Sequence, residues 1–134
     1  MNKTIRKILV VDDDEKASEF LKLELEDYID NVIVITANSG YEGLSKIMSG
    51  DIDLLLTDIA MPDMDGYELF SRTREMNREL PIIMMTGFGY DPNHVVVRSR
   101  KGGLQDVIYK PFDTKKLIRM IREKLDSGDS GDEV

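Results

Sequence analysis

The 134-residue sequence contains no cysteine, no tryptophan and a single histidine. A chain without cysteine has no disulfide framework and no thiolate metal site, and one histidine cannot form a histidine metal cluster. Ser-His catalysis has little scope for the same reason. The first apolar run covers only residues 8–11, far too few for a signal-peptide core or a membrane span. We therefore expect a reducing, cytoplasmic setting.

The composition is that of one globular domain, with 41% hydrophobic and 33% charged residues. The net charge of −8 disfavours nonspecific attraction to nucleic acid or to an anionic membrane. The charge is unevenly spread, because residues 1–67 hold 6 Lys and Arg against 15 Asp and Glu, whereas residues 94–125 hold 9 against 3. This imbalance predicts an acidic end and a basic face.

Short apolar runs alternate along the chain with segments of helical periodicity. The runs lie at residues 8–11, 32–35, 54–56, 82–85 and 107–109. Continuous apolar runs are typical of parallel strands buried on both faces. Apolar residues recur at a helical period at 17–28, 44–48, 69–76 and 117–125, and more weakly at 92–101. The sequence thus predicts an α/β fold, a doubly wound five-stranded parallel sheet with helices on both faces.

The pattern predicts a domain over residues 1–125. Residues 126–134 are rich in Ser, Gly and acidic residues, which is typical of a flexible acidic tail or the start of a linker. Asn38-Ser39 and Asp113-Thr114 carry the side chains that favour helix starts. Phe20 and Tyr28 fall on the apolar period of the first helix and are expected to cover the sheet.

Polar residues follow four of the five predicted strands, and ligands of open parallel sheets bind at these carboxyl ends. The residues are Asp12, Asp13 and Asp14 after the first strand, Asp58 after the third, Thr86 after the fourth and Lys110 after the fifth. Each has an ordinary alternative: Asp13 or Asp14 as a helix N-cap, Thr86 in a turn, and Lys110 as a solvated strand end. Their joint occurrence favours a functional site.

The chemistry of this set points to phosphoryl transfer. Asp12, Asp13 and Asp58 would repel one another unless a cation neutralises them, and Mg²⁺ prefers such oxygen ligands. Lys110 and Thr86 would add an ammonium and a hydroxyl for the oxygens of a transferring phosphoryl group. Asp58 stands alone at its strand end, which makes it the natural acceptor.

Four motifs resemble the response-regulator receiver domains of two-component signalling. They are LVVDD at residues 9–13, TDIAMPDMDGYEL at 57–69, MMTG at 84–87 and YKPF at 109–112. The resemblance covers nearly the whole chain. It implies a flavodoxin-like sheet of strand order 2-1-3-4-5 and a phosphoryl group received on Asp58 from a sensor histidine kinase or phosphotransfer protein.

The resemblance also implies a role for each matching residue. Asp13, Asp58 and the carbonyl of Ala60 would bind Mg²⁺, and Asp12 would assist through water. Thr86 and Lys110 would bind the phosphoryl oxygens, beside a cis bond between Lys110 and Pro111. Asp65-Gly66 would close the loop after the acceptor and begin the next helix.

The chain departs from the family where relatives carry Tyr or Phe three residues before the lysine, because that position is Val107. Side chains at i and i+2 share a face of a strand, so we hypothesise that Tyr109 reports phosphorylation in its place. The alternative is that the Tyr109 ring is only core packing. The Gly102-Gly103 pair is a second departure.

We interpret the chain as a phosphorylatable switch with self-catalysed transfer and slow autodephosphorylation rather than a turnover enzyme. A receiver-like interaction module that works without phosphorylation is the alternative, and an aspartate-nucleophile phosphatase using Asp12-x-Asp14 is a further rival. The predicted basic face would serve a homodimer or an effector, with no direct nucleic-acid or membrane contact. Its residues are Arg98, Arg100, Lys101, Lys115, Lys116, Arg119, Arg122 and Lys124.

Overall fold

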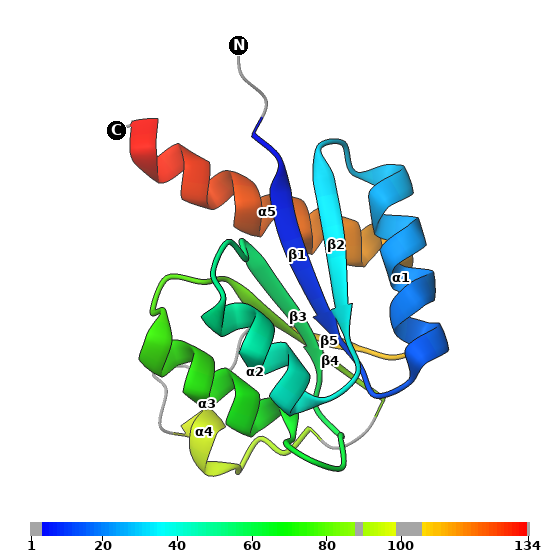
Figure 1. Cartoon of the computed structure of the whole chain (residues 1–134), viewed down its shortest axis with the longest axis vertical. Helices are drawn as coiled ribbons and strands as arrows, with labels where there is room; N and C mark the ends of the chain where they lie inside the picture. The colour runs from blue at the N-terminus through cyan, green and yellow to red at the C-terminus, as the bar shows by residue number, and fades with distance from the viewer. Residues whose placement is uncertain (1–3, 88–89, 99–105, 134) are drawn as a thin grey trace.

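A computed structural model describes residues 4–87, 90–98 and 106–133, with side chains described as far as residue 126. The elements alternate strictly along the chain, which is the order that the apolar runs predict (Figure 1). The strands are β1 (Arg6–Val11), β2 (Val32–Ala37), β3 (Leu54–Asp58), β4 (Ile82–Thr86) and β5 (Val107–Tyr109). The helices are α1 (Glu15–Tyr28), α2 (Gly40–Met48), α3 (Gly66–Met76), α4 (Val95–Arg98) and α5 (Thr114–Glu133).

All strand pairs of the sheet are parallel, and the order is β2-β1-β3-β4-β5. The predicted α/β class and strand order 2-1-3-4-5 are confirmed. The order reverses between β1 and β3, and crevices for ligands form outside the strand ends at such a switch point. The register places Val11 of β1 beside Thr57 of β3, so the next residues, Asp12 and Asp58, meet at one edge of the sheet.

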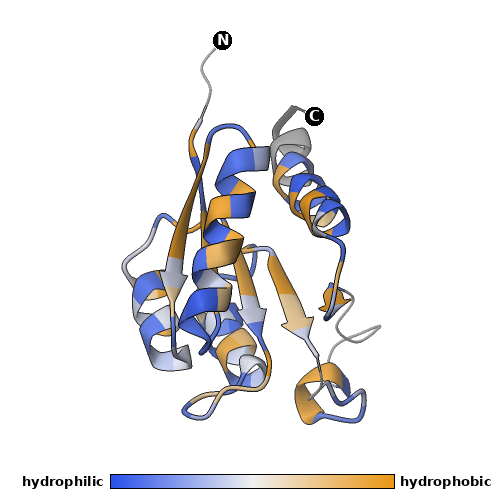
Figure 2. Cartoon of the chain, turned by 90° about the vertical axis from the view of Figure 1, so that its right-hand side faces the viewer, coloured by the Kyte–Doolittle hydropathy of each residue, from blue (hydrophilic) through white to orange (hydrophobic). Residues whose placement is uncertain are grey.

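Helices cover both faces of the sheet and enclose two separate cores. Side chains of α1 and α5 pack on one face, around Leu25 and Ile121, and those of α2, α3 and α4 pack on the other, around Ile47, Leu69 and Val97. The central strands are hydrophobic over most of their length, whereas the helices carry both polar and apolar faces (Figure 2). Among the described helices, none is long and apolar enough to cross a membrane.

Side-chain caps fix where three of the helices begin. The carboxylate of Asp14 accepts hydrogen bonds from the amides of Lys16 and Ala17, which starts α1. The hydroxyl of Ser39 starts α2, as predicted, and Asp65 starts α3 by accepting from the amide of Glu68. Each cap satisfies an amide that has no partner within the helix, which fixes the residue at which the helix begins.

The expected core face of α1 is wrong at two positions. Phe20 is 60% exposed and Tyr28 is 58% exposed, whereas the buried side chains are those of Ser18, Leu21 and Leu25. A helix lying on a sheet buries a narrow stripe, and residues beside that stripe lean outward even when they are apolar. The same reason leaves Met48 on α2 and Met76 on α3 exposed, although both fit the helical period.

Helix α5 continues to Glu133, past the domain boundary expected after residue 125. Helical hydrogen bonds are local, so the helix extends beyond its last core contact at Leu125. Whether residues 126–134 act as a linker stays a prediction. Three residues or pairs singled out from the sequence lie outside the described residues: Arg100, Lys101 and Gly102-Gly103.

Candidate functional site

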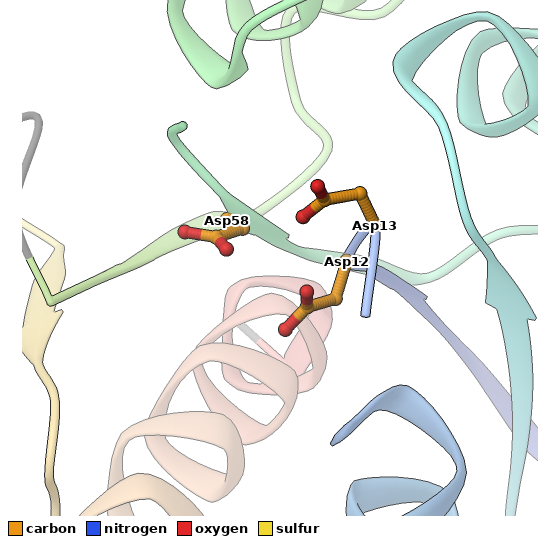
Figure 3. A group of neighbouring side chains, drawn as sticks. All are labelled: Asp12, Asp13 and Asp58. Atoms are coloured by element: carbon orange, nitrogen blue, oxygen red, sulfur yellow. The ribbon is translucent and has the colours of Figure 1, made fainter. Parts of the chain in front are cut away.

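Three carboxylates converge at the carboxyl edge of the sheet. Asp12 and Asp13 follow β1 directly and Asp58 is the last residue of β3. One oxygen from each lies within 4.8 Å of the others, and the three side chains surround one space (Figure 3). The structure therefore brings together the three aspartates that the sequence predicted as metal ligands.

The turn after β1 separates the roles of three consecutive aspartates. Asp12 is buried, and its Oδ1 accepts a hydrogen bond of 2.9 Å from the amide of Asp14. Asp14 instead caps α1, so its carboxylate is occupied by helix amides. Asp13 lies between them, exposed and directed into the acidic cluster. The N-cap alternative thus holds for Asp14 and not for Asp13.

Asp58 is held by its own backbone surroundings. Its Oδ1 accepts a 2.8 Å hydrogen bond from the amide of Ile59, and its carbonyl accepts a 2.9 Å bond from the hydroxyl of Thr57. Gly66 begins α3 against the same backbone, and a side chain at Gly66 would collide with the Asp58 carbonyl. The Asp65-Gly66 pair predicted to close this loop does so, and its glycine is required by close approach.

Lys110 reaches the site from the end of β5, and Thr86 lies beside it at the end of β4. The ammonium of Lys110 lies 3.3 Å from Asp12 Oδ2 and 3.4 Å from Asp58 Oδ2. The amide of Lys110 donates a 2.8 Å hydrogen bond to the carbonyl of Thr86, which is fully buried at the end of β4. The bond between Lys110 and Pro111 is cis, as the family resemblance implied.

Burial and neighbouring charges shift the pKa values of Asp58 and Lys110. Burial is the main cause that raises the pKa of Asp58, and the charge of Asp12 adds to it while Lys110 opposes it. Burial alone would lower the pKa of Lys110, but Asp12 and Asp58 together outweigh it and raise that pKa. The site holds three carboxylates, and the Lys110 ammonium contacts two of them, Asp12 and Asp58, so a further cation would be bound favourably. Oxygen donors of this kind fit Mg²⁺.

One supporting residue, Asn38, was not recognised as such from the sequence. The side-chain amide of Asn38 donates to the Asp12 carbonyl at 2.8 Å and to the Ser18 hydroxyl at 3.0 Å. The sequence placed Asn38 only at a helix start, because the contact joins residues 26 positions apart. The Ala60 carbonyl, a predicted metal ligand, lies two residues beyond Asp58, and its role stays a prediction.

The comparisons with known proteins agree with this geometry. Residues 8–122 match the response regulator receiver domain family. The chain is 31% identical over 122 residues to the transcriptional regulatory protein CusR of Escherichia coli, covering 91% of this chain and 52% of that protein. The chain thus spans about half the length of this curated relative.

Solved structures share the fold. A CheY-like receiver domain protein from Methanospirillum hungatei superposes with a TM-score of 0.84 at 33% identity, covering 96% of this chain and 99% of that one. The response regulator TrrA of Thermotoga maritima, solved in complex with Mg²⁺ and BeF, gives a TM-score of 0.78 at 29% identity, covering 90% and 99%.

Proposed function

The chain belongs to the response regulator receiver domain family of two-component systems, and from this premise we propose that it accepts a phosphoryl group on Asp58. The donor is a phosphohistidine on a sensor histidine kinase or a phosphotransfer protein. Modification of Asp58 then switches an output surface. The observation that carries the proposal is the position of Lys110, whose ammonium contacts both Asp12 and Asp58.

Accessibility distinguishes the acceptor from its neighbours. The Asp12 side chain is 2% exposed, and its two oxygens are engaged by the Asp14 amide and by Lys110. The Asp58 side chain is 12% exposed at the end of the central strand, which leaves a path for a phosphorus atom. Asp13 is exposed at the rim of the acidic cluster, so it suits a metal ligand better than a nucleophile.

The proposed transfer balances without any further reactant. An oxygen of Asp58 attacks phosphorus, a P–O bond forms, and the P–N bond to the donor imidazole breaks; the leaving nitrogen takes a proton from solvent. Lys110 and the Thr86 hydroxyl bind the phosphoryl oxygens, on which negative charge accumulates. Hydrolysis by water later restores the carboxylate and releases phosphate. The protein is thus a self-modifying switch rather than a turnover enzyme.

We propose that Asp12, Asp13, Asp58 and the Ala60 carbonyl hold Mg²⁺, with Asp12 acting through water. When bound, the ion supplies positive charge that offsets the crowded carboxylates and the incoming phosphoryl oxygens. The TrrA structure in complex with Mg²⁺ and BeF supports this assignment by analogy. Asn38 and Gly66 support the site indirectly, because they fix the backbone of Asp12 and Asp58.

The rival functions are less favoured. A phosphatase using Asp12-x-Asp14 needs both carboxylates in the site, but Asp14 caps α1. A receiver-like module that acts without phosphorylation does not require Lys110, Asp12 and Asp58 to converge as they do.

The test is stoichiometric labelling by a small phosphodonor such as acetyl phosphate, followed by intact-protein mass spectrometry. Wild-type protein with Mg²⁺ is expected to take up one phosphoryl group, and Asp58→Asn none. Asp30→Asn, an exposed loop carboxylate, is the matched control and should be labelled like wild type. Labelling of Asp58→Asn at the wild-type rate would place the acceptor elsewhere.

A further inference from the structure

Two tyrosine rings meet beside the phosphorylation site. Tyr109 on β5 and Tyr90 in the connection between β4 and α4 have ring centroids 6.0 Å apart and planes at 85°, an edge-to-face pair. Tyr90 is partly buried against the core under α2, α3 and α4, whereas Tyr109 is 57% exposed. The Tyr109 ring is therefore not core packing, and its described aromatic contact is with Tyr90.

Each ring of the pair lies close along the chain to a predicted phosphoryl ligand. Tyr109 lies opposite Thr86 in the pairing of β4 with β5, and it directly precedes Lys110. Tyr90 follows Thr86 by four residues. A shift of Lys110 toward new oxygens therefore acts on Tyr109 through one peptide bond, and a shift of Thr86 acts on it through the β4–β5 pairing.

The connection is also attached on its other side. The amide of Asp91, next to Tyr90, donates a hydrogen bond to the Tyr67 hydroxyl of α3. The Tyr67 ring stacks on His94 at 3.9 Å with planes at 13°, just before α4 begins. The Tyr90–Tyr109 contact thus links the edge strand β5 to a segment that is already fixed to α3 and to the start of α4.

We propose that the Tyr90–Tyr109 ring pair positions Thr86 and Lys110 in the unphosphorylated protein and that phosphorylation of Asp58 releases it. The inference rests on the proposed function. The pair coexists with the ion pair between Lys110 and Asp58, which belongs to the carboxylate form of Asp58. In an acyl phosphate the negative charge moves outward onto the phosphoryl oxygens, so Lys110 and the adjacent Tyr109 follow it.

The ring contact and phosphoryl binding are thermodynamically linked, and this linkage determines whether removing the contact tightens or weakens binding. A contact that stabilises the unphosphorylated state must be lost when the phosphorylated state forms, so removing the contact beforehand favours phosphoryl binding. Edge-to-face pairs of this kind correspond to about a two- to tenfold change in an equilibrium constant. Tyr109→Ala and Tyr90→Ala should each tighten binding of the phosphoryl mimic beryllofluoride, with Mg²⁺ present, by about that factor.

Conservative variants separate this positioning role from general packing. Tyr109→Phe and Tyr90→Phe keep the ring edge and face, so both should bind beryllofluoride as wild type does. The double variant Tyr90→Ala/Tyr109→Ala should bind no more tightly than the better single variant, because either change already removes the contact. Additive effects of the two alanine changes would overturn the proposal.

Tyrosine spectroscopy gives a direct second readout, because the chain has 5 tyrosines and no tryptophan. Fluorine NMR of protein labelled with 3-fluorotyrosine, assigned by single Tyr→Phe variants, should show shifts at Tyr90 and Tyr109 when Mg²⁺ and beryllofluoride bind. Tyr28, at the far end of α1, is the internal control and should not shift.

Failure of the ring-pair proposal can be told apart from failure of the proposed phosphorylation of Asp58. If calorimetry shows beryllofluoride binding while Tyr90 and Tyr109 keep their resonances, the ring-pair proposal is wrong and the proposed function stands. If the alanine variants weaken beryllofluoride binding instead of tightening it, the ring pair stabilises the phosphorylated state, and the proposal is likewise overturned. If wild-type protein binds no beryllofluoride with Mg²⁺, both the function and the inference fail.

Discussion

The centre and the β5 edge of the sheet are built differently, and the site draws residues from both. Strands β3 and β4 are buried at every position, and β1 is buried over its last four residues. Strand β5 has three residues whose burial runs from partial through complete to exposed. Asp12, Asp58 and Thr86 come from the centre, whereas Lys110 follows the edge strand.

This difference separates a fixed part of the site from a more adjustable part. A strand paired on both sides and covered on both faces has little freedom to move, so the carboxylates keep their spacing. A short edge strand is paired on one side and opens more readily. The proposed acceptor therefore lies at the rigid centre, and the lysine proposed to bind the phosphoryl oxygens lies next to the adjustable edge.

The largest expected contrast is in stability. Leu56 of β3 is completely buried, so Leu56→Ala should lower the free energy of unfolding by about 2–5 kcal/mol. Tyr109→Ala on β5 removes an exposed ring and one ring contact, which should cost about 1 kcal/mol. Urea unfolding of both variants measures the contrast. Equal losses would show that the edge is packed as firmly as the centre.

The next contrast concerns metal binding by neighbouring aspartates. Asp13→Asn removes a carboxylate of the cluster and should weaken Mg²⁺ binding by about 10- to 100-fold, at least the loss seen when outer partners of metal ligands are changed. Asp14→Asn should change the affinity by less than about twofold, because Asn also caps helices well. Calorimetric titration with Mg²⁺ compares them, and equal weakening by both changes would contradict the assignment of Asp13 as a ligand.

Sequence patterns predicted the centre of the sheet well, because its strands are determined by apolar residues that are adjacent in the sequence. Continuous apolar runs marked β1, β3 and β4. Asp12 and Thr86 directly follow the first and the last of these runs, and Asp58 lies two residues after the run of β3. The strand ends then had to meet, since parallel strands of one sheet share a carboxyl edge. The helix start at Ser39 was equally readable, because the cap involves only the next three residues.

The sequence was less informative where a residue's surroundings come from distant parts of the chain. Periodicity placed Phe20 toward the core, but the width of the buried stripe depends on how α1 lies on the sheet. The Asn38 bond to the Asp12 carbonyl crosses between two strand ends. The Tyr90–Tyr109 ring pair has no sequence signal, because Tyr90 belongs to no regular element.

A smaller effect is expected in the pH dependence of stability. The pKa of Asp58 is raised above its ordinary value of 3.8, chiefly by burial, so the folded protein binds more protons than the unfolded chain just above that value. Asp58 therefore makes the protein less stable as pH rises through this window. Asp58→Asn removes that loss and should be more stable than wild type at neutral pH. The difference should shrink toward pH 3.8, as measured by urea unfolding at several pH values without Mg²⁺.

Urea unfolding at several pH values also tests the interaction between Asp58 of the central strand and Lys110, which follows the edge strand. Lys110 offsets some of the cost of burying Asp58, so Lys110→Met should enlarge the stabilisation gained by Asp58→Asn. An Asp58→Asn variant with the same pH profile as wild type would show that the Asp58 carboxylate is well solvated in the folded protein.

The smallest expected effect lies on the outer surface of α5, the helix that follows the edge strand. We propose that its exposed basic residues contact an acidic partner or a second copy of the chain. Part of the charge is already used within the domain, since Lys124 pairs with Asp106 at 2.8 Å and Arg122 donates to the Tyr28 carbonyl at 3.0 Å. Lys116 and Arg119 are the exposed residues better suited to a partner.

Arg119→Glu should therefore weaken partner binding or dimerisation by no more than about fivefold, because exposed ion pairs contribute about 0.2–1 kcal/mol. The loss should fade as salt is added, since exposed charges are screened. Arg78→Glu, the same charge change in the turn before β4, is the matched control and should have no effect. Sedimentation velocity at low and high salt measures the response. Identical association of wild type and Arg119→Glu at low salt would mean that the basic surface of α5 is only solvated.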